Sequence, residues 1–327
     1  MTKPATDAER RAAAIPEPLD AAARAALEPL DAAARAALDP EVRAVLDGFY
    51  LDYRGPLTAA WSWNRAGTDD GLGRADQLLA VLDREFPHTP LIWYERAFNL
   101  VKRKRRADAL RLLEEFGGRY AAVLDVDTLA LWGRCLKDQA DEYRAAGQFA
   151  AAEAEFAAAE AKYDQAYKVS KGDRFPGINV ATLRLLRAAV LKRLTAPAAA
   201  ADTQNRDEAA KVEARIAALR EGSRERAAEV LASRPGWTRT LPDDDIWMTA
   251  TAAEAAFLQS DWALAEQLYR AALRPENQPL PHHFASAGGQ LVRLTEAFAA
   301  LGTPPPPPFD RPAQFLSALQ PKPETLP

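Results

Sequence analysis

The sequence predicts an all-α fold, a solenoid of antiparallel helix pairs stacked side by side. Strong helix formers such as Ala, Leu, Glu and Arg occur in long runs. Alanine recurs at fixed intervals within those runs, as at Ala140, Ala152 and Ala159. Residues with β-branched side chains rarely alternate with polar ones, so no sheet is expected. Hydrophobic residues make up 48% of the chain, a level that suits closely packed helices because so many of them are alanine.

The clearest helix pair is expected around a turn at Gly147. Tyr143 precedes this turn by four residues, and Phe149 and Phe156 follow it among the alanines. Two helices cross closely only where small side chains meet, and large aromatic side chains then fill the gaps between neighbouring pairs. Gly147 can adopt the left-handed conformation that a tight turn needs. This order of residues is the signature of a tetratricopeptide repeat (TPR), although one Ala-rich hairpin would explain this window alone.

Further windows carry the same spacing. Ala253 and Ala265 are twelve residues apart, which is the interval between the corresponding alanines of the central pair. Ala75 and Ala109 are separated by 34 residues, which is one TPR period. Several independent windows therefore favour a TPR-like α-solenoid over a single hairpin.

The composition along the chain divides it into three parts. Residues 1–40 are rich in Ala and Pro, contain one ten-residue sequence twice, and are predicted to form a mobile arm. Residues 41–301 are predicted to form the repeat domain, with a polar insertion or linker near 196–207. Residues 302–327 are predicted to be a Pro-rich tail with a short capping helix.

Charge and cysteine content restrict the classes of partner. The net charge is −4 and the pI is about 5.6, which argues against a general nucleic-acid binder. Cys135 is the single cysteine, so no internal disulfide can form, as expected in a reducing cytoplasm. No apolar run approaches the roughly 18 residues of a membrane span. We expect a cytoplasmic protein that binds another protein or a peptide.

No catalytic constellation, cofactor motif or metal-ligand spacing stands out. The best candidates for a site are Arg134, Lys137, Asp138 and Asn179. Arg134 and Lys137 are three residues apart and share one helix face. Asn179 is predicted to cap a helix that begins at Val180. Two interpretations stay open: hydrogen bonds that tie adjacent helix ends together, which we favour, and a direct ligand site.

The one dense basic run lies between two predicted repeat helices. It includes Arg103 and Arg105 within the sequence Lys-Arg-Lys-Arg-Arg. We interpret it as a solvated turn, and the alternative is a docking patch for an acidic partner.

Three phrases in the central region resemble a known family. They are Thr128–Asp138 (TLALWGRCLKD), Tyr163–Tyr167 (YDQAY) and Pro176–Leu183 (PGINVATL). They look like the TPR region termed the TRAF-binding domain of apoptosis signal-regulating MAP kinase kinase kinases, which also occurs in many bacterial TPR proteins. The later phrase Asp245–Ala255 is similar to the bacterial relatives. Within these phrases and the central turn, four residues are expected to have structural roles: Gly133, Gly147, Gly177 and Ile178.

The resemblance implies an all-helical regulatory module that binds proteins. This chain departs from the family because it has no kinase domain and carries a long insertion before Tyr163. A TRAF-type adaptor is therefore not the expected partner. The function predicted from the sequence is a non-enzymatic scaffold or regulatory adaptor that presents a concave helical groove, in a bacterial signalling or defence complex. The alternative is a module that senses a small molecule or nucleotide.

Overall fold

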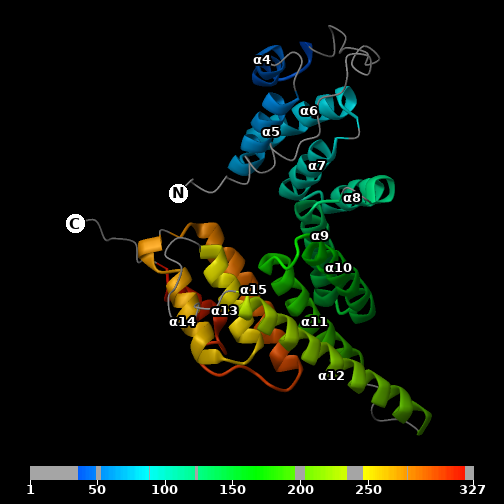
Figure 1. The fold of residues 1–327 in the computed structure, drawn as a ribbon, viewed down its shortest axis with the longest axis vertical. Helices are drawn as coiled ribbons and strands as arrows, with labels where there is room; N and C mark the ends of the chain where they lie inside the picture. Colours follow the sequence, from blue (N-terminus) through cyan, green and yellow to red (C-terminus); the bar gives the residue numbers. More distant parts are fainter. Residues whose placement is uncertain are drawn as a thin grey trace. The chain divides into compact units, whose positions relative to one another are not determined.

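The structure is a computed structural model. It describes residues 36–48, 53–87, 89–121, 124–195, 203–233, 246–277 and 279–320. The chain divides into two compact units, one up to Leu131 and the other from Trp132 onward. All regular elements in the described residues are helices, so the predicted all-α class is confirmed (Figure 1).

The first unit consists of helices that alternate in direction along the chain. Their bounds are α4 (Pro40–Gly48), α5 (Arg54–Ala66), α6 (Asp69–Glu85), α7 (Pro90–Lys102) and α8 (Arg106–Tyr120). Helix α5 packs against α6 and α7, and α7 packs against α8, as expected for successive helix pairs. Ala60, Ala75 and Leu78 are completely buried at the centre of this core.

Helix α9 (Val126–Ala145) contains the division between the two units. The remaining helices belong to the second unit: α10 (Phe149–Val169), α11 (Arg174–Thr195), α12 (Thr203–Ala232), α13 (Ile246–Leu258), α14 (Trp262–Ala272), α15 (Pro281–Ala300) and α16 (Pro312–Ser317). A short 3-10 helix, Pro275–Asn277, follows α14. Residues 203–207 of the predicted linker belong to α12, whereas residues 196–202, like most of the predicted arm, lie outside the described residues.

The alanines that predicted the repeat lie where helices touch. Ala140, Ala152, Ala159, Ala253 and Ala265 are all completely buried. Aromatic side chains fill the space beside them, as the TPR pattern requires. The TPR-like solenoid of stacked antiparallel helix pairs is therefore confirmed.

The turns within the helix pairs share a left-handed residue. Gly147, between α9 and α10, has a φ of 73°, and Gly67, between α5 and α6, has a φ of 68°. The corresponding turns of two other pairs place Lys104 and Ser260 at φ values of 60° and 62°. A residue with a Cβ pays a steric cost in this conformation, which glycine avoids.

Replacing Ser260 with glycine is therefore expected to raise the free energy of unfolding by about 0.5–1 kcal/mol, after allowance for the greater freedom of glycine in the unfolded chain. Urea denaturation followed by circular dichroism measures the change. Gly147→Ser is the matched control and should change stability in the opposite direction. Equal stability of Ser260→Gly and the wild type would show that the turn carries no such cost.

Helix α11 is the centre of the second unit. It packs against α10, α12, α13 and α15, and its residues 176–183 are continuously buried (Figure 1). A helix covered on several sides needs apolar residues all round rather than on one stripe. Helix α15 packs against both α11 and α13, the first helices of two successive pairs. It therefore covers the inner face that these two helices would otherwise present.

The C-terminal segment after α15 packs back against other helices of the second unit. Phe309 is completely buried and makes edge-on ring contacts with Phe257, Tyr269 and Phe315. Aromatic pairs in this geometry stabilise a fold beyond the area that they bury. The proline-rich tail therefore anchors α16 against the last helices of the unit.

Candidate functional site

The residues singled out in the central motif lie together on α9 and α11. Arg134, Lys137, Asp138 and Asp141 occupy one face of α9, as their spacing of three and four residues requires. Lys137 is only 9% exposed, and its ammonium group donates a hydrogen bond of 2.9 Å to Oδ1 of Asn179. Of the predicted site residues of α9, Lys137 thus contacts Asn179 of α11, and Arg134 and Asp138 lie on the same face of α9 as Lys137.

The prediction that Asn179 caps a helix is wrong. Helix α11 begins at Arg174, so Asn179 lies inside it, where its side chain donates 2.9 Å to the carbonyl of Phe175. The amide of Phe175 donates instead to the carboxylate of Asp173 at 2.9 Å, which makes Asp173 the capping residue. Pro176 does not break the helix because it lies in the first turn, where its missing amide has no partner to lose.

Two further helices contribute polar groups to this cluster. Gln290 of α15 is buried, and its amide donates 3.1 Å to the hydroxyl of Thr182 on α11 and 3.4 Å to a carboxylate oxygen of Glu254 on α13. Arg293, one turn further along α15, pairs with Asp141 at 2.6 Å. Side chains of α9, α11, α13 and α15 therefore form one polar cluster within an otherwise apolar unit.

The electrostatics of the cluster are dominated by burial. Burial lowers the pKa of Lys137 to about 8, helped by the nearby charge of Arg293 and opposed by Asp138 and Glu254. Burial likewise raises the pKa of Glu254 to about 7, opposed first by the charge of Lys137. Two groups that change charge near neutral pH thus face the same small region. Perturbed pKa values of this kind are common at functional sites.

The sequence patterns did not single out Glu254, Gln290 or Arg293 as site residues. One signal was available for Glu254, which is the only charged residue of α13, a helix otherwise rich in Ala and apolar residues. A lone carboxylate in such a helix needs a partner when it packs. Gln290 and Arg293 gave no comparable signal.

The two motif glycines lie at close helix contacts. A Cβ added at Gly133 would be 2.7 Å from two ring carbons of Tyr163 on α10. A Cβ added at Gly177 would be 3.0 Å from the ring of Tyr167 and 3.1 Å from Val230 on α12. Ile178 is buried beside them. These positions require glycine because helices pack tightly there. The glycines therefore have a packing role and are not themselves part of the polar cluster.

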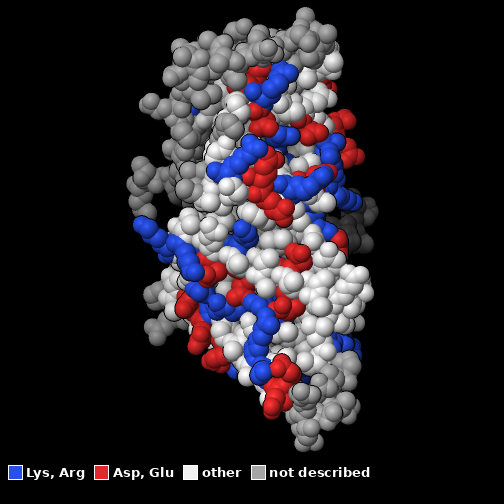
Figure 2. Space-filling model, turned by 90° about the vertical axis from the view of Figure 1, so that its right-hand side faces the viewer, with Lys and Arg blue, Asp and Glu red and all other residues white. Residues whose placement is uncertain are grey.

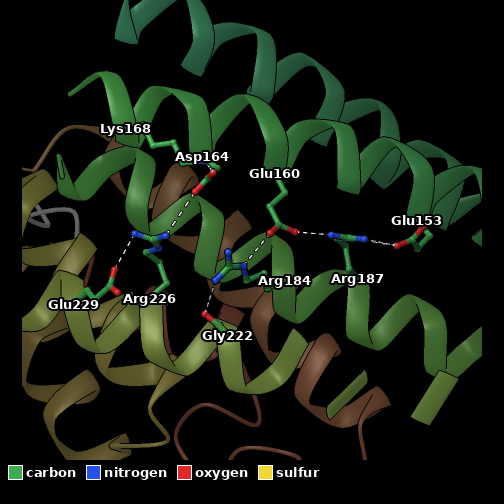
Figure 3. Close-up of polar contacts among 9 residues, drawn as sticks. All are labelled: Glu153, Glu160, Asp164, Lys168, Arg184, Arg187, Gly222, Arg226 and Glu229. Carbon is green, nitrogen blue, oxygen red and sulfur yellow. Dashed lines mark hydrogen bonds and ion pairs between the residues drawn. The ribbon is translucent and has the colours of Figure 1, made fainter. Parts of the chain in front are cut away.

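A ladder of ion pairs joins α10, α11 and α12 (Figure 3). Arg187 pairs with Glu153 at 2.9 Å and with Glu160 at 2.7 Å, and both carboxylates are mostly buried. Arg184 also pairs with Glu160 and donates 2.9 Å to the carbonyl of Gly222 on α12. Each arginine satisfies groups on another helix, which assigns the ladder to holding the three helices together.

The residues of the predicted basic run lie in the turn between α7 and α8. Arg103 pairs with Asp76 of α6, and Arg105 pairs with Asp108 at 2.7 Å. Both arginines are thus engaged within the first unit. On the face shown in Figure 2, basic and acidic side chains lie beside one another over the described residues. That arrangement gives no large field of one sign on this face.

The first unit has a second candidate surface on α5 and α7, which lie side by side. The guanidinium of Arg65 lies between the rings of Trp61 and Phe98, 4.9 Å and 4.2 Å from their centroids. A fork of two 3.3 Å hydrogen bonds joins Arg65 to the buried carboxylate of Glu95. The ammonium of Lys102 lies 5.5 Å from the centroid of Phe98. We call Trp61, Arg65, Phe98 and Lys102 the cation-aromatic strip; Lys102 is exposed and the other three residues are partly exposed.

The stacked helix pairs and their buried alanines define a TPR-type helical protein. A family model described as Tetratricopeptide Repeats-Sensor matches residues 72–184, a range that includes Lys137 and Asn179. No curated protein and no solved structure matches the chain. This match covers less than half of the chain and supports a repeat-based interaction or sensor module over that range, and the resemblance to the TRAF-binding domain stays a prediction.

Neither a bilayer-spanning helix nor a cluster of three metal-ligating side chains is present in the described residues. None of the helices there combines the length and the apolarity that a bilayer crossing requires. No group of three or more His, Cys, Asp or Glu side chains in the same residues is arranged to hold a metal ion.

Proposed function

We propose that this chain is a non-enzymatic regulatory scaffold that holds a protein or peptide partner on the cation-aromatic strip of α5 and α7. Repeat proteins usually bind partners through the surface formed by the first helices of successive pairs. In the second unit, α15 covers that surface on α11 and α13. In the first unit, the strip leaves aromatic and cationic side chains partly exposed on the equivalent helices.

The observation that carries the proposal is the way Arg65 is held. Its guanidinium contacts two rings and is held by the fork to Glu95, yet 29% of the side chain stays exposed. A side chain ordered before binding loses little freedom when a partner arrives. Rings and arginine are also the groups that contribute most to protein interfaces. Arg65 and Lys102 each place a cation beside a ring, a combination that suits a segment bearing carboxylates and apolar side chains.

The test is co-purification from native lysate, followed by affinity measurement with the partner that is recovered. The double variant Phe98→Ser/Lys102→Glu is expected to lower the affinity for the partner at least about tenfold, since it removes one ring and reverses one charge of the strip. Arg111→Glu on α8 is the matched control, because Arg111 is 77% exposed and lies outside the strip.

Two outcomes would contradict the proposal. One is a chain that stays alone at micromolar concentration in lysate. The other is equal binding by the wild type and the Phe98→Ser/Lys102→Glu variant. If binding is lost only after charge reversal at Arg103, Arg105 and Arg106, the partner binds the basic run and not the strip.

A further inference from the structure

Lys137 is a buried cation whose hydrogen bonds are incomplete. An ammonium group has three N–H donors. Among the described residues, the Lys137 ammonium makes one hydrogen bond, to Asn179, and the ring of Tyr163 lies 5.9 Å away. Buried cations in proteins are normally paired with an anion, because an uncompensated charge away from water is costly.

The carboxylates of the cluster do not complete this set of bonds. Asp141 is held by Arg293 at 2.6 Å, and Glu254 accepts from Gln290. Glu254 and Asp138 influence Lys137 electrostatically, but neither forms an ion pair with it within 4 Å in the described residues.

Two further cations, Arg134 and Arg293, belong to the same cluster, and Arg293 pairs closely with Asp141. Arg134 and Arg293 both approach Asp138, each at 3.8 Å, which is longer than a charge-assisted hydrogen bond. Arg134 is 56% exposed and Arg293 is 26% exposed, whereas Lys137 is buried. The cluster thus holds three cations and the three carboxylates of Asp138, Asp141 and Glu254, and among the described residues only Arg293 forms a close ion pair, with Asp141.

We propose that Lys137, Arg134 and Arg293 form a binding site for a small oxyanion in the second unit. The ammonium and the two guanidiniums supply donors suited to phosphate, sulfate or a carboxylate. Asn179 acts as a positioning residue, since it holds the ammonium while its own amide is fixed by the carbonyl of Phe175. This site lies in the second unit and the cation-aromatic strip in the first, so either proposal can fail without the other.

The site makes anion binding depend on pH. A bound oxyanion stabilises the charged form of Lys137, so binding raises the pKa of Lys137 from about 8. Above pH 8, anion binding is therefore accompanied by protonation of Lys137. Affinity should therefore be high below pH 8 and fall as the pH rises through 8. The other groups that face Lys137 are Arg134, Asp138 and Asp141 on α9, Tyr163 on α10, Glu254 on α13 and Arg293 on α15. Glu254 becomes neutral below about pH 7, which also favours an anion.

The test uses sulfate on the full chain, because sulfate keeps its charge between pH 6 and 9. Calorimetric titration against chloride at matched ionic strength should show saturable sulfate binding at pH 7. The affinity should be about tenfold lower at pH 9, as the charged fraction of Lys137 falls. Phosphate and acetate titrations then distinguish oxyanions by charge and shape.

Lys137→Met should weaken sulfate binding at least about tenfold, because it keeps the side-chain length and removes the charge. Lys192→Met is the control, since Lys192 is 44% exposed and pairs with Glu213 elsewhere on the unit. If Lys137→Met fails to fold, Arg134→Gln, at an exposed position, should still weaken binding severalfold. Absence of saturable binding in the wild type, or full binding by Lys137→Met, would overturn the proposal.

Discussion

Replacing Arg187 with methionine is expected to lower the free energy of unfolding by about 2 kcal/mol, because it removes the buried arginine that two mostly buried carboxylates share, although each carboxylate keeps one other arginine. Arg187 is 14% exposed and donates from Nε, Nη1 and Nη2 to Glu153 and Glu160 on the neighbouring helix. Methionine keeps most of the packing of the side-chain stem, so the loss reports chiefly on the charges (Figure 3).

A control for this effect acts on the same carboxylate. Arg215 of α12 also pairs with Glu153, at 2.7 Å, but it is 50% exposed. Arg215→Met should therefore change stability by less than about 0.5 kcal/mol. Adding Glu153→Gln and Glu160→Gln to Arg187→Met should restore part of the loss, because the carboxylates are then no longer charged. Chemical denaturation of the four proteins measures the series, and equal losses for Arg187→Met and Arg215→Met would contradict the role assigned to burial.

The repeat architecture was predictable because small residues determine it locally. A helix pair can close only where residues such as Ala140 and Ala152 meet, and this requirement appears as a fixed interval in the sequence. This spacing of small residues is the same whichever other helices the pair packs against. The left-handed turn at Gly147 followed from the same local rules.

The polar cluster could be predicted only in part, because its members come from distant helices. Lys137 and Asn179 belong to phrases that the sequence marks, but Gln290 meets Thr182 across a separation of 108 residues. That contact exists because α15 lies across α11 and α13, and no local pattern in α15 encodes this placement. The mistaken cap at Asn179 has a different cause. Pro176 and Gly177 resemble helix breakers, yet the first suits a first turn and the second allows Tyr167 and Val230 to pack closely.

Replacing Gly133 with alanine is expected to lower the free energy of unfolding by about 2 kcal/mol, although alanine is the better helix former. The new methyl group would lie 2.7 Å from the Cδ2 and Cε2 atoms of Tyr163, which is too close for carbon atoms in contact. Tyr163 is 1% exposed and is packed between α9 and α11, so its ring has little room to move. The steric cost should therefore exceed the gain of about 1 kcal/mol from helix propensity.

Two further variants separate the steric effect of the added methyl group from its effect on helix propensity. Gly118→Ala in α8 is the matched control, because a Cβ there meets no atom within 4 Å, and it should be neutral or stabilising. Tyr163→Leu alone should be destabilising, since it leaves a cavity, but it should make the added methyl at position 133 much less costly. Thermal and urea unfolding of the single and double variants give the coupling energy. A coupling energy near zero would mean that the Tyr163 ring can move away from an added methyl group at little cost. Close packing would then not explain the glycine at position 133.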